Sequence, residues 1–365
     1  FNFDEKLIGT SWEPNLVFIG TLNWLPFFYI FWIFQTFLNT EKKRHQFSIA
    51  LLSGTFPLFL SGFSQYFLKL FGPFKTFFGT IIWYQREVNS ESGLSSVFNN
   101  PNYAGTWFCA ILPFAIFHTI NNKNTKINRS ISFLFCTLIV FSIILTQSRN
   151  ALIGLFLGFF PLIKASIIYL LIFIILFLFL FFIILNSYIF KQDFNINNYL
   201  INFNQINNLR FAEIYEFPRI LIWLNSLKLT IQKPIFGWGA STFDKLYQFP
   251  DPIASSIGQI YVAHSHNIVF DISISYGIPA AIFFSLNILL ILYKLINLPR
   301  IEEIKFDQYK QLDVAITISL IILCVSQLFD ITYFDGRISI LFWLLVANGV
   351  SIIKERRKEK NHMHL

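Results

Sequence analysis

The pentapeptide "AHSHN" at positions 263–267 holds the side chains best suited to proton transfer. Histidine titrates near neutral pH, so an imidazole here could take a proton from a hydroxyl group. His264 and His266 could instead bind a metal ion or be held by local backbone groups, but no Cys or acidic cluster at metal-ligand spacing accompanies them. Asp271 follows and could orient the imidazole if this stretch is helical. We expect a general base here, with no metal and no cofactor.

Two arginines could hold an anion. Arg149 lies in "TQSRNA", a tight turn between two apolar runs, and Arg219 lies at the start of a predicted helix. A guanidinium group near a helix amino terminus suits phosphate oxygens. Alternatively, Arg149 extends to lipid head groups, and Glu213 or Glu216 balances Arg219. Two arginines and a histidine on one membrane face fit a lipid-linked phosphate or pyrophosphate substrate, with histidine deprotonating an acceptor hydroxyl. In contrast, Asp335 and Arg337 are expected to pair in a turn without chemistry.

The elements that position these residues are membrane helices. The chain is 55% hydrophobic and only 13% charged, against about 25% charged residues in soluble domains. Residues 165–185 carry no charge over the roughly 20 residues that cross a bilayer. The sequence therefore predicts an all-α, polytopic transmembrane helix bundle. Because the first residue is Phe, we expect further spans in the full chain. The nine candidate spans are 16–38, 48–68, 103–120, 130–147, 150–163, 165–189, 277–297, 312–333 and 337–353.

Basic residues predict the orientation. More than half of the 28 Lys and Arg residues fall in one alternate set of short loops and in the tail. Cationic short loops stay in the cytoplasm, so the carboxyl terminus is expected inside. The formal net charge of +8 is then mainly a topology signal, and we expect no nucleic-acid partner. The cationic segments are 41–46, 121–129, Lys164, 294–310 and 354–360.

This orientation places three segments outside. The first is 69–102, where "GPFKTFFGTIIWYQ" is expected to form an interfacial amphipathic helix and Arg86 is a supporting residue. The second is the turn that holds Arg149. The third is a long loop with a surface helix from Pro218, whose stripe of Ile220, Trp223 or Leu224, Leu227 and Ile231 faces the membrane or the spans. The predicted division is 1–190, a bundle of six spans; 191–276, the extracytoplasmic loop; 277–353, three spans; and 354–365, a cytoplasmic tail.

Four stretches, in this order, resemble the O-antigen ligase and O-antigen polymerase superfamily of bacterial inner-membrane proteins. They are "GLSSVFNNPNYAG" (93–105), "LTQSRNALIGL" (145–155), "RILIWLNSLKLTIQKPIFGWGASTF" (219–243) and "HNIVFDISISYGIPA" (266–280). The family's histidine motif is His, then Asn, Ser or Gln, then nine residues and Gly. His266, Asn267 and Gly277 match it, so the resemblance assigns the base to His266 and leaves His264 and Asp271 as supporting residues.

The resemblance further implies a metal-independent glycosyltransferase of lipopolysaccharide biosynthesis, acting at the periplasmic face of the inner membrane. Arg149 and Arg219 would hold the pyrophosphate of an undecaprenyl-linked oligosaccharide or polysaccharide donor, and lipid A–core or another glycan would be the acceptor. The sequence "GIPAAI" departs from the ligase pattern after Gly277, which keeps a polymerase open as the alternative. Some members of the superfamily are labelled bicarbonate transporters, so transport of inorganic carbon is a second alternative.

Overall fold

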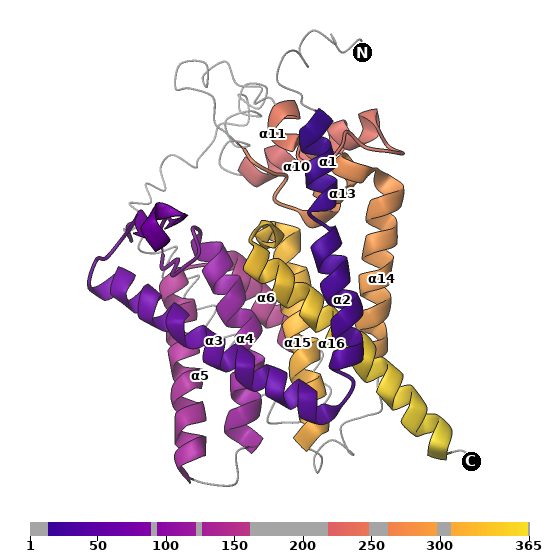
Figure 1. Cartoon of the computed structure of the whole chain (residues 1–365). Coiled ribbons are helices and arrows are strands. Elements are labelled where there is room, and N and C mark those ends of the chain that lie inside the picture. Colours follow the sequence, from indigo (N-terminus) through magenta and orange to yellow (C-terminus); the bar gives the residue numbers. More distant parts are fainter. Residues whose placement is uncertain are drawn as a thin grey trace, which may run out of the picture. The chain divides into compact units, whose positions relative to one another are not determined.

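The computed structural model describes residues 14–88, 93–121, 126–160, 218–247, 262–297 and 308–363. The chain divides into two compact units, one of residues 1–26 and 181–287 and the other of residues 27–180 and 288–365. Apart from one short hairpin, the regular elements of the described residues are helices (Figure 1). Seven of these helices are long and apolar enough to cross a membrane. The predicted fold class, an all-α bundle with multiple spans, is confirmed.

The helices are bounded as follows. They are α1 (Pro14–Leu22), α2 (Leu25–Phe37), α3 (Glu41–Phe67), α4 (Pro101–Asn121), α5 (Lys126–Thr146), α6 (Arg149–Phe159), α10 (Pro218–Gln232), α11 (Phe243–Leu246), α13 (Ile268–Tyr276), α14 (Ile278–Ile296), α15 (Gln308–Phe329) and α16 (Gly336–Met363), with two short 3-10 helices, η2 (Phe77–Gly79) and η7 (Thr332–Phe334).

Most of the observed helices begin and end within a few residues of the expected spans. The first span is interrupted after Leu22, although residues Val17–Phe37 together remain long enough to cross a bilayer. Within the fifth expected span, 150–163, α6 ends at Phe159 and has 11 residues, and residues 161–163 lie outside the described residues. A helix of that length covers about half of the hydrocarbon core. The expected span 165–189 lies outside the described residues.

The larger unit is built around α4 and α15, whose side chains are mostly buried, and α4 lies against α5, α6 and α15 (Figure 1). Small residues permit this close packing. A Cβ atom added to Gly158 of α6 would lie 2.4 Å from Cγ1 of Ile322 in α15. In contrast, α2 and α14 expose most of their large apolar side chains, as lipid-facing helices do.

Residues 41–46 were expected in a cytoplasmic loop, and this expectation is wrong, because α3 already begins at Glu41. Thr40 caps the helix by accepting a hydrogen bond from the backbone N–H of Lys43 (3.4 Å). The early start places the side chain of Arg44 in the packed interior, where none of it is exposed. In the tail segment 354–360, α16 continues as a helix to Met363, and the cytoplasmic position of this segment stays a prediction.

The interfacial helix expected near residue 75 is also wrong. Residues Phe74–Thr76 (β1) and Ile81–Trp83 (β2) form an antiparallel hairpin, with Phe74 paired to Trp83. Gly79 adopts φ +85° at the turn, a conformation that favours glycine. Phe77 and Phe78 are exposed at the tip, so the segment still presents apolar side chains, but as a hairpin loop.

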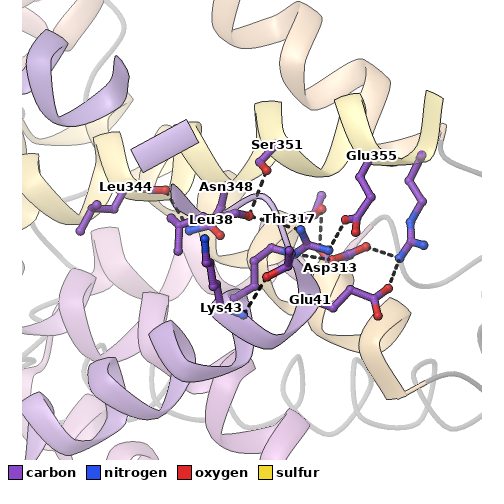
Figure 2. A network of polar contacts seen from close by, with 12 residues as sticks. Leu38, Glu41, Lys43, Asp313, Thr317, Leu344, Asn348, Ser351 and Glu355 are labelled. Atoms are coloured by element: carbon purple, nitrogen blue, oxygen red, sulfur yellow. Dashed lines mark hydrogen bonds and ion pairs between the residues drawn. The ribbon is translucent and has the colours of Figure 1, made fainter. Parts of the chain in front are cut away.

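A cluster of charged side chains ties α3, α15 and α16 together (Figure 2). Arg44 Nε lies 3.3 Å from Asp313 Oδ1, and its Nη2 donates to Glu355 Oε2 at 2.5 Å. Arg356 Nη2 lies 2.6 Å from Asp313 Oδ2 and 3.6 Å from Glu41 Oε1. We call these five side chains the inner-end cluster, because they lie at the helix ends that the basic loops assign to the cytoplasm.

The smaller unit has its own apolar core. It is formed by Ile222 and Leu229 of α10, Phe243 of α11, Tyr247 directly after α11, and Ile274 of α13. The stripe expected to face the membrane or the spans is exposed where it is described, at Leu224, Leu227 and Ile231. The opposite face of α10 is the one that packs in this unit. An exposed apolar stripe is compatible with the predicted position on a membrane surface.

Candidate functional site

His266 occupies a constrained turn. Its backbone has φ +53°, which is uncommon for a residue other than glycine. The side chain of the next residue, Asn267, caps α13 by accepting hydrogen bonds from Val269 N (2.9 Å) and Phe270 N (3.3 Å). The buried Ser265 hydroxyl donates to the Asn267 carbonyl at 2.9 Å. These bonds hold the strained residue at the head of a helix, a type of position where functional side chains concentrate.

His264 supports this turn. Its Nδ1 accepts a hydrogen bond from the backbone N–H of His266 at 3.3 Å, and the centroids of the two imidazole rings are 4.3 Å apart. The bond engages Nδ1 of His264 in local structure. The geometry therefore favours a turn-forming role for His264.

Gly277 ends the helix that begins after Asn267. It adopts φ +92°, and an added Cβ atom would lie 2.0 Å from the carbonyl oxygen of Ile235. Only glycine fits this position, because any side chain would meet both backbone strain and a direct overlap. The spacing of the His-Asn-Gly motif thus corresponds to a turn, an amino-terminal cap and one nine-residue helix, α13, closed by glycine.

The loop after α10 fixes the other side of α13. Trp238 N donates to the Ile274 carbonyl (2.6 Å), and the Trp238 indole Nε1 donates to the Leu229 carbonyl (2.8 Å). The ammonium group of Lys233 lies over the same indole ring, 4.2 Å from its centroid. This "PIFGWG" loop therefore joins α10 to α13 and makes them one packed unit.

Arg219 is the second residue of α10, which matches its predicted position at a helix start. Its side chain is partly buried. The glutamates that could balance it, Glu213 and Glu216, lie outside the described residues. Since α10 and α13 share one core, the structure brings Arg219 and the His266 motif into the same compact unit. Its predicted role in phosphate binding stays a prediction.

Asp271 lies in the first turn of α13. Burial raises the pKa of its carboxyl group to about 7, so the group changes charge near neutral pH. No hydrogen bond joins Asp271 to His266 among the residues that the structure describes. The predicted orientation of the imidazole by Asp271 therefore stays a prediction, although the stretch is helical as that prediction required.

Arg149 belongs to the larger unit and is the first residue of α6. Ser148 caps that helix by accepting a hydrogen bond from Ala151 N at 3.2 Å. Before it, Gln147 adopts φ +53°, which turns the chain sharply between α5 and α6. The side chain of Arg149 is exposed, so its guanidinium group is available to an anion at a helix amino terminus.

Sequence reasoning missed the residues that hold this turn. Ser148 Oγ donates to Asn102 Oδ1 at 2.9 Å, and Asn102 Nδ2 donates to Asp330 Oδ2 at 2.7 Å. Asp330 is 1% exposed. This chain of bonds fastens the start of α6 to α4 and to the end of α15. One signal was present, because Asn102 lies in a motif stretch and Ser148 directly precedes Arg149.

Arg86 has an exposed side chain. Its backbone carbonyl accepts a bond from Gln65 Nε2 at 2.7 Å, so the described contact involves the main chain, and its supporting role stays a prediction. The predicted pair of Asp335 and Arg337 is confirmed, with an Nη2–Oδ2 distance of 2.5 Å. The Arg337 guanidinium group also lies over the ring of Phe98, 4.3 Å from its centroid.

The structure thus gathers the histidine motif and Arg219 in one unit, and Arg149 and Arg86 in the other. That Arg149, Arg219 and His266 share one membrane face stays a prediction from the basic loops.

Comparison with known proteins identifies the region that holds these residues. Residues 134–285 match the model of the family described as O-antigen ligase. The matched segment begins in α5 and ends in α14, and it contains Arg149, Arg219, His266 and Gly277. No curated protein matches the chain. The match over residues 134–285 supports the resemblance of the motifs to the superfamily of O-antigen ligases and polymerases.

Proposed function

We propose that this protein joins a glycan carried on undecaprenyl pyrophosphate to a hydroxyl group of an acceptor, at the periplasmic face of a bacterial inner membrane. The observation that carries the proposal is the built turn at the head of α13. His266 is held there in a strained conformation by Ser265, Asn267 and the glycine-closed helix behind it. A role in packing alone would not need a titratable side chain in such a turn.

In this reaction His266 accepts the proton of the acceptor hydroxyl. The acceptor oxygen attacks the anomeric carbon of the first donor sugar, and the bond from that carbon to the pyrophosphate oxygen breaks. Undecaprenyl pyrophosphate leaves with the bonding electron pair, and the histidine later releases its proton to solvent. The reaction needs no oxidant, and the protein's own task is to hold the base, the acceptor and the leaving group in line.

Arg149 and Arg219 supply positive charge for the leaving group. Each lies at the amino terminus of a helix, where backbone N–H groups add to the attraction for phosphate. Charge develops on the leaving pyrophosphate as its bond to carbon breaks. Cations placed there stabilise the transition state more than the bound donor, and therefore accelerate the reaction.

The distribution of charge favours an enzyme over a carrier. A transporter lines its path with polar or ionisable groups near the middle of its spans. In the described spans, every Asp, Glu, Lys and Arg lies within five residues of a span end. The buried inner-end cluster follows this rule, since Arg44 is near the start of α3 and Asp313 near the start of α15.

A pair of single variants tests the role of His266. The His266→Ala protein should insert normally and lose about 10²–10⁴-fold of its glycan transfer rate, the usual cost of a missing general base. The matched control, His264→Ala, should lose much less, because His264 lies outside the motif spacing and its Nδ1 accepts a bond from a backbone N–H in the turn. Equal losses at both positions, together with activity abolished by a chelator, would contradict a general base and indicate a metal site.

Deletion of the gene, followed by a gel of surface polysaccharide, separates the possible reactions. A ligase predicts a lipid A–core free of long chains, with lipid-linked polymer accumulating. A polymerase, the alternative in the same superfamily, predicts a core that bears a single repeat unit. Unchanged glycan together with impaired uptake of inorganic carbon would refute the enzyme and support transport.

A further inference from the structure

The inner-end cluster pairs three carboxylates with two arginines at one end of the larger unit. Its three acids all turn toward its two arginines: Asp313 contacts both, Glu355 contacts Arg44, and Glu41 contacts Arg356. The side chains of these acids are 8%, 24% and 28% exposed, respectively. Figure 2 shows the three carboxylates directed into the space between α3, α15 and α16. Each of the three carboxylates of the cluster is therefore engaged by an arginine.

Five further cations at this end are exposed. Lys42 of α3, Lys294 of α14 and three residues of α16 are exposed, namely Lys354, Arg357 and Lys358. The three on α16 have the spacing i, i+3 and i+4, which places them on one face of the helix. Lys354 also donates to Gln35 Oε1 at 2.8 Å. These five exposed side chains make this end of the described residues cationic.

These cations border a surface that faces lipid. The exposed apolar side chains of Leu289, Leu290 and Tyr293 on α14 lead directly to Lys294. The apolar span of α16 ends at Lys358, so Arg357 and Lys358 lie where a membrane helix meets the head-group layer. A cationic surface at that depth meets phospholipid head groups before it meets any soluble partner.

We propose that this basic end binds anionic phospholipid head groups, and that the inner-end cluster serves the binding by withdrawing the acids that would otherwise repel them. The proposal is independent of the glycan reaction. It goes beyond topology, because cationic loops alone set orientation, whereas exposed cations beside carboxylates that are paired with arginines also attract one class of lipid. The attraction is electrostatic and should weaken as salt rises.

Lipid titration tests the proposal. The whole protein in a mild detergent is titrated with phosphatidylglycerol or phosphatidylcholine, and the midpoint of thermal unfolding is followed by tryptophan fluorescence. We expect phosphatidylglycerol to raise the midpoint and phosphatidylcholine to leave it unchanged. Each cation near an anionic surface contributes about fivefold in affinity, so Arg357→Gln with Lys358→Gln should weaken phosphatidylglycerol binding about 25-fold.

The matched control is Lys75→Gln with Lys228→Gln, which removes two exposed cations elsewhere in the chain and leaves the same net charge. It should bind phosphatidylglycerol like the natural protein. A second variant, Arg357→Lys with Lys358→Arg, keeps the charges and should also bind normally, which separates loss of attraction from damage to α16. Equal weakening in the control, lost binding in the charge-retaining variant, or equal response to both lipids would overturn the proposal.

Discussion

Replacing Arg44 should destabilise the protein more than replacing its partner Asp313. Both side chains are buried, and Arg44 is fully enclosed between α3, α15 and α16. Removal of one member of a buried ion pair typically costs about 3–5 kcal/mol of unfolding free energy, because the other charge stays buried without compensation. The actual cost of each variant depends on whether the other charged side chains of the cluster still compensate the charge that remains.

The net charge that each variant leaves in the cluster predicts which of the two substitutions costs more stability. Two arginines and three acids sum to one negative charge. Arg44→Met leaves two negative charges, with Arg356 as the one cation of the cluster, and should cost the full 3–5 kcal/mol. Asp313→Asn leaves the cluster neutral, since Arg44 keeps Glu355 and Arg356 keeps Glu41. Its cost should be about 1–3 kcal/mol, that of impaired buried hydrogen bonds.

The combination of Arg44→Met with Asp313→Asn returns the cluster to its natural net charge. The double variant should therefore be more stable than Arg44→Met alone, with a coupling energy of about 1–3 kcal/mol. Unfolding by SDS in mixed micelles, followed by tryptophan fluorescence, gives the four free energies of this cycle. An Asp313→Asn cost equal to or above that of Arg44→Met, or strict additivity in the double variant, would refute the reasoning from net charge.

Three further predictions concern the candidate site. Arg149→Lys and Arg219→Lys should each weaken the affinity for the lipid-linked donor several-fold, since lysine lacks the planar two-donor fork that suits phosphate. Titration of the transfer activity with donor measures this affinity. Full activity in both variants would indicate that the two arginines only anchor the protein to lipid head groups. Gly277→Ala should abolish folded protein, because its Cβ would lie 2.0 Å from a carbonyl oxygen, whereas Gly54→Ala in α3 meets nothing within 4 Å and should leave the unfolding midpoint unchanged or raised. Asp271 has a folded-state pKa of about 7 against a reference value of 3.8, so the folded protein binds more protons between those values and stability falls as pH rises from about 4 to 7. Asp271→Asn should reduce that loss, measured as the difference in unfolding midpoint between pH 5 and pH 8, and an unchanged difference would contradict the raised pKa.

Sequence alone predicted the class of protein and most of its spans. Hydropathy is a local property, and the bilayer thickness converts about 20 apolar residues into one helix. The motif spacing was also local, because His266, Asn267 and Gly277 lie on one short helix with its caps. For the same reason the Asp335–Arg337 pair, two residues apart, was predicted correctly.

Local reasoning went wrong where turn chemistry or capping decided. The hairpin at 74–83 was read as a helix because its apolar residues outweighed Gly79 at the turn. The start of α3 was read as a loop because six polar residues in a row, 41–46, suggested contact with water, although Thr40 provides a helix cap. Charged residues at a span end can belong to the helix when partners from other helices neutralise them.

Those partners could not be predicted from the sequence. Arg44 and Glu355 are 311 positions apart, and Asn102 and Asp330 are 228 apart. No periodicity or spacing relates residues so distant, because their contact depends on how α3, α4, α15 and α16 pack. The sequence determined which segments enter the membrane and which short motif carries the histidine. The tertiary structure alone decided which charges are buried together and which helix ends are fastened beside Arg149, since a charge enters a packed interior only where folding brings an opposite charge to meet it.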